Sequence, residues 1–497
     1  VVLGAGSMAG HWDLSRLIVY YDSNNAQISG KVDRSDSTNY SQVFEGFGWH
    51  VQEIDGHDHE KIREAIEKAQ VVDRPSLIIG NTIMAKGAAN VEGDHETHGA
   101  PLDPEEIKAT KEKLGLPQEQ FYLPNEVVEH FQSRFKTLTD SCQQWKSQID
   151  SASQNNDFDV AWKCVHQTTY PELEYPTFDA GTKLATRKAF GATLDKFADQ
   201  IPNLIGGSAD LEPSNYTGNF ATKFGDFSKT NRTGRNLAFG VREFPMAAAM
   251  NGIALHGGLI PFGGTFLVFA DYERPALRLG SIQKCRVMHE FTHDSFWVGE
   301  DGPTHQPIEH AMALRAIPNL NVYRPADAKE TAVCFKLALE SHETPSALLL
   351  TRQGVPVLES SIDATIDGVT RGAYSVYDCD SPELIFLATG SEVSLAMEVA
   401  QQMNDKKIRV VSMPCWELFE SQSSDYKRSL IPTRGAMKIS FEAGVTLGWD
   451  RYIGSNGLAI GIDHFGASAP GADLAEEFGF TAPKVEAKIR EHLGSLL

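Results

Sequence analysis

Residues His59–Gly80 read HEKIREAIEKAQVVDRPSLIIG, and this stretch decides the fold class. Apolar side chains recur at helical spacing over residues 59–70, and the closing run SLIIG, residues 76–80, is typical of a buried strand. Another apolar run, LIVYY at residues 17–21, comes earlier in the chain. Strands that alternate with helices predict a parallel sheet with helices on its faces.

The same alternation begins again near Asp179 and once more near Gly372. We therefore predict an α/β protein of three consecutive domains with mainly parallel sheets, the first of them truncated. The predicted parts are a first domain over 1–115, a polar helical connector over 116–178, and further domains over 179–355 and 372–497. We expect strands at 204–207, 264–269, 287–291, 347–350, 383–388, 407–413, 437–442 and 458–462, and helices at 104–114, 183–200, 246–255, 392–403 and 482–493.

The N-terminal residues VVLGAGSMAG read as a strand over 1–3 followed by a glycine-rich turn. This pattern is similar to a dinucleotide-binding fingerprint. Only Ala9–Arg16 separate the turn from the next strand, whereas a parallel crossover needs about 10–12 residues. We therefore reject a nicotinamide site. Because the chain starts at Val1, we expect the natural protein to extend further.

Composition excludes several classes of protein. The chain has 497 residues, with 45 Lys and Arg against 66 Asp and Glu, and its net charge of −21 disfavours nucleic acid or an anionic membrane as partner. The longest apolar run, Leu259–Ala270, is broken by proline and glycine and is too short to cross a bilayer. The six cysteines form no C-x-x-C pair, which indicates reduced thiols and a cytoplasmic protein.

Polar clusters follow several of the expected strands. They are His293–Ser295 with Gly299–Pro307, Gly206–Asn215, Arg242–Glu243, Arg352, and the pair His95 and His98. Each cluster alone also fits a surface loop, a turn or a helix cap. Together they place Arg, His, Ser, Asp and Glu at strand ends, where α/β proteins bind ligands, and they predict a phosphorylated polyol as substrate.

A series of longer motifs carries a resemblance to a known family. In order, these are ATRKAF, GGSADLEPSN, FGVREF, PFGGTFLVF, THDS, VGEDGPTHQP, RPAD, TRQ, ATGSEV, RVVSMP and FGASAP. The sequence resembles the transketolases from about Ala9 to its C-terminus. THDS together with DGPTHQP is more similar to transketolases than to deoxyxylulose-phosphate synthases.

The resemblance implies a ketol transferase of the pentose phosphate pathway that depends on thiamine diphosphate. Such an enzyme moves a two-carbon glycolaldehyde unit from a ketose phosphate to an aldose phosphate. It implies a diphosphate-binding first domain, a pyrimidine-binding second domain and a C-terminal transketolase domain. It also implies a homodimer with active sites at the subunit interface.

The resemblance also assigns roles to residues. Glu243 matches the glutamate that hydrogen-bonds the aminopyrimidine, and Glu243, His305 and His98 are the expected catalytic residues. The expected cofactor-binding residues are Asp210, Glu243, Phe266, Phe269, Tyr272, Asn24 and His98, with His95 a weaker candidate. The expected substrate-binding residues are Arg187, Ser214, His293, Asp301, His305 and Arg352.

For the metal, the resemblance points to Asn24 and the carbonyl of Ala26, oxygen ligands that suit Mg²⁺ or Ca²⁺. In this family a Gly-Asp-Gly turn supplies a further aspartate. The expected counterpart here is Gly4-Ala5-Gly6, which lacks the carboxylate. Phe244-Pro245 and Phe296-Trp297 also depart from the family pattern, and both leave the shape of the pocket open.

Two alternatives remain open at this point. One is a related enzyme with another acceptor, of the dihydroxyacetone synthase type, although Asp301 favours a hydroxylated aldose. The other is a catalytically impaired or non-catalytic relative, for which Ala5 and the expected truncation are the evidence.

Overall fold

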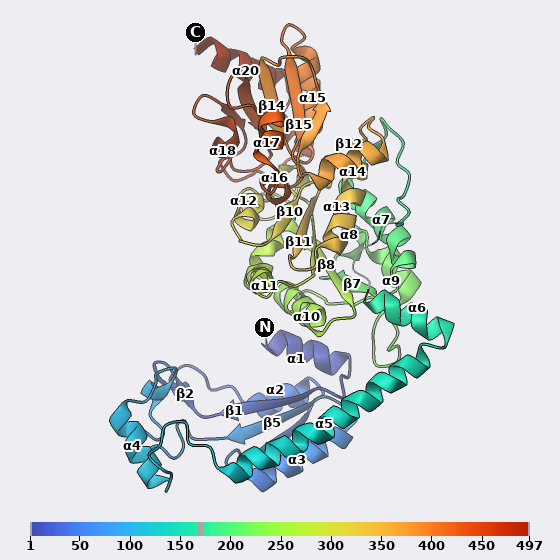
Figure 1. Cartoon of the computed structure of the whole chain (residues 1–497). Helices are drawn as coiled ribbons and strands as arrows, with labels where there is room; N and C mark the ends of the chain where they lie inside the picture. Colours follow the sequence, from blue (N-terminus) through green and yellow to red (C-terminus); the bar gives the residue numbers. More distant parts are fainter. Residues whose placement is uncertain (1, 167–169, 171, 496–497) are drawn as a thin grey trace. The chain divides into compact units, whose positions relative to one another are not determined.

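The computed structural model describes residues 2–166, 170 and 172–495 (Figure 1). Val1, residues 167–169 and 171, and residues 496–497 belong to the predicted first domain, connector and third domain, and lie outside the described residues. The described residues form two compact units. The N-terminal unit holds Val2–Trp162 and Ser228–Arg232, and the C-terminal unit holds 163–227 and the residues from 233 on.

A parallel three-stranded sheet forms the centre of the N-terminal unit, in the order β1-β5-β4. Its strands are β1 (Ile18–Ser23), β4 (His50–Asp55) and β5 (Ser76–Asn81). Helices α1 (Val2–His11) and α2 (Tyr40–Gly46) pack on Leu77 and Ile79, whereas α3 (His59–Val71) packs on Ile78. The sheet is thus covered on both faces, as the pattern over residues 59–80 predicts.

The remaining elements of this unit are β2 (Ala26–Gln27), β3 (Gly30–Lys31), α4 (Pro104–Lys113) and α5 (Asn125–Ala152), and α6 (Asn156–Val165) continues the chain beyond it. Helix α5 is the long ribbon in Figure 1. No helix among the described residues is both long and apolar enough to span a bilayer.

The prediction for the N-terminus is wrong. Residues 2–11 form helix α1, so Gly4-Ala5-Gly6 lies inside a helix and is not a turn after a strand. Gly6 is buried there, where an added Cβ would come 2.9 Å from the Phe44 ring. Gly6 therefore allows close packing of α1 against α2. Ala5 is consequently not the counterpart of a metal-binding turn residue, and its lack of a carboxylate is no evidence of impaired catalysis.

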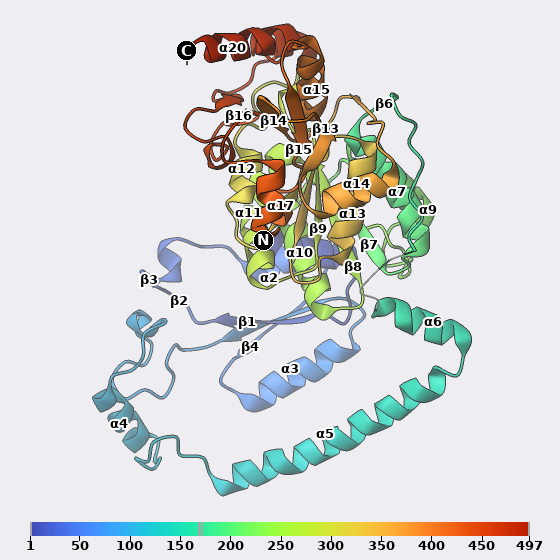
Figure 2. The same ribbon diagram turned by 45° about the horizontal axis from the view of Figure 1, so that its top comes forward.

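The C-terminal unit contains two sheets, and the first is fully parallel, in the order β10-β11-β9-β8-β7. Its strands are β7 (Leu204–Ser208), β8 (Ile260–Phe266), β9 (Met288–Thr292), β10 (Asn321–Tyr323) and β11 (Ser346–Leu350). One face carries α7 (Thr186–Gln200) and α13 (Ala328–Glu340). The other carries α10 (Glu243–His256), α11 (Ala270–Ile282) and α12 (His310–Arg315) (Figure 2). The short helices α8 (Glu212–Asn215) and α9 (Gly218–Phe224) follow β7.

The second sheet has the order β13-β15-β14-β16-β17, with only β13 antiparallel. Its strands are β13 (Tyr374–Tyr377), β14 (Leu384–Ala388), β15 (Ile408–Ser412), β16 (Met437–Phe441) and β17 (Leu458–Ile460). Helices α15 (Glu392–Gln402) and α20 (Ala482–Ser495) cover one face, and α16 (Trp416–Glu420), α17 (Ser424–Leu430) and α18 (Asp450–Ile453) cover the other. The smaller elements are β6 (Lys183–Leu184) paired with β12 (Val355–Pro356), α14 (Ile362–Thr370) and α19 (Gly471–Glu477).

A buried arginine joins the two sheets of this unit. Arg324, just after β10, donates from Nε to Asp294 at 2.9 Å and from Nη1 to the carbonyl of Thr389 at 2.9 Å. The same guanidinium is paired with Glu392 at the start of α15. Its charge is thus balanced across the boundary between the sheets, as a fully buried charge requires.

The predicted α/β class with mainly parallel sheets is confirmed. Several element boundaries differ from the prediction, among them those of β8 and α7. The strand expected over 264–269 ends at Phe266 and passes into a 3₁₀ turn, Leu267–Phe269, and the helix expected from Lys183 begins at Thr186. The structure also contains β4, β10 and β13, which were not predicted.

Candidate functional site

An aromatic and histidine cluster lies where β8 and β9 end. The rings of Phe266 and His293 are 3.8 Å apart between centroids, and Phe269 stacks on Phe266 at 5.7 Å. His305 meets Phe269 edge-on at 5.7 Å, and Tyr272 lies 6.0 Å from Phe269 on the outer side, with 62% of its surface exposed. Three predicted cofactor aromatics and two predicted substrate histidines therefore form one surface at the carboxyl ends of parallel strands, the usual place for a ligand.

His293 is held in a strained and nearly water-free position. Its backbone φ is +62°, in the left-handed region that few non-glycine residues adopt, and its side chain is buried. Its Nδ1 lies 2.8 Å from Thr292 Oγ1. Burial, and then the positive charges of Arg187 and Arg352, lower the pKa of His293 to about 3. The imidazole is therefore neutral near pH 7, with a hydrogen-bonding nitrogen for a ligand.

A buried hydrogen-bond network ties the Gly206–Asn215 loop to this cluster. Ser208 donates to Asn215 at 2.7 Å, and Asn215 donates to Thr292 at 3.1 Å. The backbone amide of Leu211 donates to Ser208 Oγ at 2.9 Å. Asn215 and Ser208 thus fix the loop that carries the predicted ligands next to the end of β9.

The predicted ligands of this loop occupy its exposed side. Asp210 is exposed and has a left-handed backbone with φ of +65°, and Ser214 is half-buried. The carbonyl of Ser214 accepts a hydrogen bond from Arg187 Nη1 at 2.9 Å. Ser214 therefore orients the arginine through its backbone.

Two predicted arginines, Arg187 on α7 and Arg352 after β11, line one cavity of about 280 Å³. The cavity is also lined by Lys188 and Tyr216, and the Arg187 guanidinium lies 5.3 Å from the centroid of the Tyr216 ring. Burial lowers the pKa of Arg187, but only within a range where it stays charged. Convergent cations of this kind suit a phosphate group. Lys188 and Tyr216 were not predicted, although both adjoin motifs that sequence reasoning singled out.

Glu243 and Asp301 lie on other elements of the same unit. Glu243 is the first residue of α10, is half-buried, and follows Arg242. Helix α10 packs on β8, where an added Cβ at Gly263 would come 2.7 Å from the Met250 sulfur. Asp301 is exposed on the loop between Gly299 and His305, two residues after a left-handed glycine.

That loop is held by the third predicted domain. Gln306 is buried and donates to the carbonyl of Gly299 at 2.7 Å and to that of Ala467 at 2.8 Å. Ser468 donates to the carbonyl of Glu300 at 2.5 Å. The FGASAP motif therefore supports the segment that carries Asp301 and His305.

The N-terminal unit has a cavity of its own, of about 500 Å³, which Asn24 and His98 both line. Asn24 Oδ1 accepts from the Ala26 amide at 3.0 Å, and this fixes the turn after β1. Asp22 and His57 line the same cavity and were not predicted. The carboxylate of Asp22, the amide of Asn24 and the Ala26 carbonyl are hard oxygen donors close in sequence, which fits Mg²⁺ or Ca²⁺.

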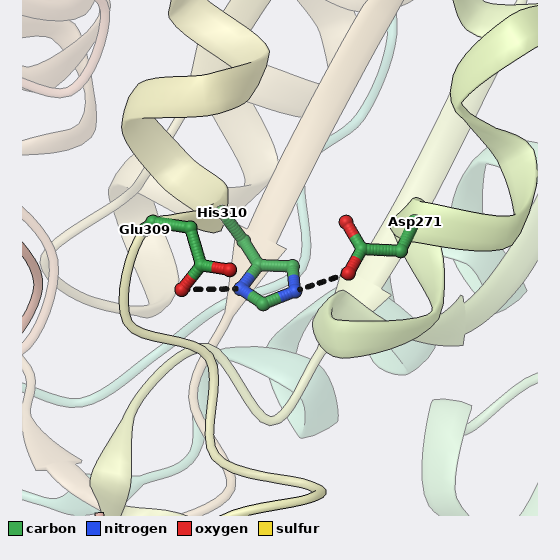
Figure 3. A group of neighbouring side chains, drawn as sticks. All are labelled: Asp271, Glu309 and His310. Carbon is green, nitrogen blue, oxygen red and sulfur yellow. Dashed lines mark hydrogen bonds and ion pairs between the residues drawn. The ribbon is translucent and has the colours of Figure 1, made fainter. Parts of the chain in front are cut away.

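A second group of possible metal ligands is Asp271, Glu309 and His310 (Figure 3). The imidazole lies between the two carboxylates, with Nε2 3.2 Å from Asp271 and Nδ1 3.8 Å from Glu309. Each ring nitrogen thus faces a different carboxylate on an opposite side. The three possible ligand atoms all lie within 4.8 Å of one another.

Comparison with known proteins agrees with this geometry. Three family models match the chain: "Transketolase, thiamine diphosphate binding domain" over residues 1–162, "Transketolase, pyrimidine binding domain" over 182–357 and "Transketolase-like TK C-terminal domain" over 372–481. The chain is 42% identical to a transketolase of Halalkalibacterium halodurans, over 98% of this chain and 74% of that protein. It is 43% identical to that of Geobacillus stearothermophilus, over 99% and 75%.

Solved structures agree as well. Transketolase from Leishmania mexicana superposes with a TM-score of 0.93 at 39% identity, covering 98% of this chain and 73% of that one. A Pichia stipitis transketolase in complex with sedoheptulose 7-phosphate superposes with a TM-score of 0.93 at 36% identity, covering 99% and 74%.

Proposed function

This chain belongs to the transketolase family and is a ketol transferase that uses thiamine diphosphate, and we propose which of its residues carry out the reaction. The reaction transfers a two-carbon unit from a ketose phosphate to an aldose phosphate. The observation that carries the assignment of residues is the cluster of His293, Phe266, Phe269 and His305 beside the cationic cavity of Arg187 and Arg352.

Each unit contributes proposed cofactor-binding residues. Phe266, Phe269 and Tyr272 would pack around the aminopyrimidine, while Glu243 would exchange a proton with its ring nitrogen. Asp210 would lie near the thiazolium, and His98 near the diphosphate. Bound thiamine diphosphate supplies the electron sink for cleavage of the carbon–carbon bond. The stacked, mostly buried rings of Phe266 and Phe269 fit a flat aromatic ligand and exclude water from it.

The sugar phosphate would extend from the histidines to the arginines. Arg187 and Arg352, with His293 and Ser214, would bind the phosphate, since convergent donors recognise it best. His305 would lie beside the reacting carbon and hold or release a proton there. Asp301 would accept a hydrogen bond from the 2-hydroxyl of the aldose. The related Pichia stipitis structure with a bound seven-carbon sugar phosphate supports this class of substrate.

The metal site, the oligomeric state, the cellular compartment and the pathway are also proposals. Asn24 and the Ala26 carbonyl, with Asp22, would bind Mg²⁺ or Ca²⁺ in the N-terminal unit, a set that their oxygen chemistry supports. Membership of the family supports a homodimer with shared active sites, a cytoplasmic enzyme and a place in the pentose phosphate pathway. We propose the predicted domain boundaries, with a connector over 116–178, on the same basis.

The two alternatives lose their main support. A non-catalytic relative was suggested by Ala5, which lies within helix α1 and not in a metal-binding turn. A dihydroxyacetone synthase type of acceptor is not favoured, because the named relatives are transketolases along nearly the whole chain.

The test of the phosphate assignment is Arg352→Ala, assayed with phosphorylated and unphosphorylated donors. We expect KM to rise roughly ten- to a hundred-fold for the phosphorylated donor, the size of a lost charged hydrogen bond, and little for the other. Arg428→Ala, which removes an exposed arginine paired with Asp425 on its own helix, is the matched control. An equal rise for both donors would show that Arg352 has only a structural role.

A further inference from the structure

Strand β9 carries an acid in the centre of a buried sheet. Glu290 is fully buried, between β8 and β11, and Gly264 is its neighbour in register on β8. A Cβ added at Gly264 would come 2.4 Å from Glu290 Oε2. The absence of a side chain at Gly264 is therefore what leaves room for this carboxyl.

The carboxyl of Glu290 has no hydrogen-bond partner in the described part of the chain, at either oxygen. Burying an unpaired acid is costly, and native proteins keep such groups for a reason. In contrast, the neighbouring His289, which faces the opposite side of the sheet, is bonded to Glu273 at 3.0 Å. Glu290 is thus the titratable group on β9 whose presence the fold itself does not explain.

The charged group that acts on Glu290 is Arg187. Both side chains lie on the face of the sheet that α7 and α8 cover, and Arg187 Nε is also buried without a partner among the described residues. Its Nη1 donates to the carbonyl of Ser214. Arg187 thus lines the cavity of about 280 Å³ and lies on the same face of the sheet as the unpaired acid.

We propose that Glu290 is a positioning residue of the anion site: it is the internal counter-ion of Arg187 and takes up one solvent proton when an anion binds that guanidinium. This rests on the proposed function, in which Arg187 binds the sugar phosphate. In the empty site the arginine favours the carboxylate, and a bound dianion cancels that influence. Glu290 then becomes the neutral acid that its buried position favours.

The charged groups around the site determine whether anion binding raises or lowers the proton affinity of Glu290. Burial raises the pKa of Glu290 well above its usual range, and Arg187 opposes the rise. An anion that neutralises Arg187 raises the proton affinity of Glu290, so anion affinity must fall as pH rises. His293 faces the same two arginines and His305, and is the other group whose proton affinity an anion would increase. Removing the Glu290 carboxyl separates its contribution from that of His293.

The experiment is calorimetric titration with sulfate, which does not itself titrate near neutrality, between about pH 6 and about pH 9 in buffers of different ionisation enthalpy. For the unmodified protein we expect proton uptake of at most one per sulfate, greatest toward the alkaline end of this range because burial raises the pKa of Glu290 in the empty site. Over that part of the range the affinity should fall by up to about tenfold per pH unit. For Glu290→Gln, which keeps the shape of the side chain, we expect both effects to drop to the small remainder due to His293. Uptake that is the same in Glu290→Gln would overturn the proposal.

Infrared difference spectra of the unmodified protein, with and without sulfate, give a second readout that needs no variant. A carbonyl band of a buried carboxylic acid should appear on binding and shift when glutamate is isotopically labelled. Its absence would also refute the proposal. Glu273→Gln is the matched control, because Glu273 is equally buried, but on the other face. It should leave the proton uptake unchanged.

Arg187→Ala separates a failure of the proposed function of Arg187 from a failure of the inference about Glu290. If sulfate affinity does not change in this variant, the proposed function of Arg187 fails. If sulfate binding is lost in Arg187→Ala but Glu290→Gln still takes up the proton, only the inference about Glu290 fails.

Discussion

Two of the proposed site residues, Asp210 and His293, have left-handed backbones that cost of order 1–3 kcal/mol each. Such strain persists only where the surroundings fix it, and here the Ser208–Asn215–Thr292 network does so. The sequence shows that these positions are an aspartate and a histidine, but not that their backbones are strained. The chemical groups at these two positions could be predicted from the sequence, but their backbone conformations could not.

The first prediction concerns the charge of His293. Because burial and two arginines lower its pKa to about 3, its ring should remain neutral from about pH 8 down to about pH 5. The ring signals in a ¹⁵N NMR pH titration, assigned with His293→Asn, should not move over this range. Arg352→Ala removes one of the positive charges and should raise the pKa. A ring that titrates near the usual histidine value would contradict this account.

The second prediction concerns Asp301, which is exposed and free to face a ligand. Asp301→Ala should lower kcat/KM for aldoses with a 2-hydroxyl by roughly ten- to a hundred-fold, or about 1.5–3 kcal/mol, because a charged hydrogen bond is lost. Aldoses that lack this hydroxyl should be affected little. Glu300→Ala is the neighbouring control. If both kinds of aldose suffer equally, Asp301 does not bind the 2-hydroxyl.

At the scale of elements, apolar periodicity predicted most strands of the two sheets in the C-terminal unit, but among their helices only α7, α10, α15 and α20. It failed where packing overrides the local pattern. Residues 267–269 are as apolar as a strand, yet they turn away after β8 so that Phe269 can stack on Phe266. Strand β4 has the sequence HVQEID, in which polar residues mask the apolar alternation. Residues 2–11 form a helix, in which Gly6 allows close contact with the Phe44 ring.

The loop that carries Asp301 gives a third prediction. Gln306→Ala removes two buried hydrogen bonds that hold this loop, each worth about 1 kcal/mol. We expect a fall of about 1–3 kcal/mol in unfolding free energy and a rise in KM for the acceptor, measured by urea denaturation and steady-state kinetics. In the control Gln422→Ala, the lost side-chain amide donates a local hydrogen bond to the carbonyl of Leu418. This variant should change KM for the acceptor by no more than about twofold. A normal KM in Gln306→Ala would mean that the loop keeps its shape without the glutamine.

At the scale of the whole molecule, the two sheets of the C-terminal unit depend on buried charge at their boundary. Arg324 is one such group, and Glu330 on α13 is another. Glu330 accepts hydrogen bonds from Ser412 at 2.6 Å and Tyr374 at 2.9 Å, both from the second sheet. The motifs RPAD and ATGSEV were visible in the sequence, but their role in joining two sheets required the fold.

The last prediction follows from that boundary. Burial, and then the charge of Asp327, raise the pKa of Glu330 to about 7. The pKa of Glu330 in the folded protein thus lies above its ordinary value. The contribution of Glu330 to folding stability is therefore complete below about pH 4.5 and is lost as pH rises through about 7. In Glu330→Gln the loss of stability between about pH 5 and about pH 8 should be smaller than in the unmodified protein, measured by denaturant titration at each pH. Identical pH profiles would show that Glu330 does not titrate in this range.

Residues 467 and 468 are hydrogen-bonded to the loop over 299–306, and these bonds limit which domains of this enzyme can be exchanged with those of relatives. Predicted domain boundaries suggest modules that could be exchanged between relatives. A chimera that keeps the pyrimidine-binding part and takes the last domain from a distant relative would replace the residues that hydrogen-bond its own loop over 299–306. Chimeras should therefore fold into active enzymes most often when the loop over 299–306 and the FGASAP motif come from the same parent protein.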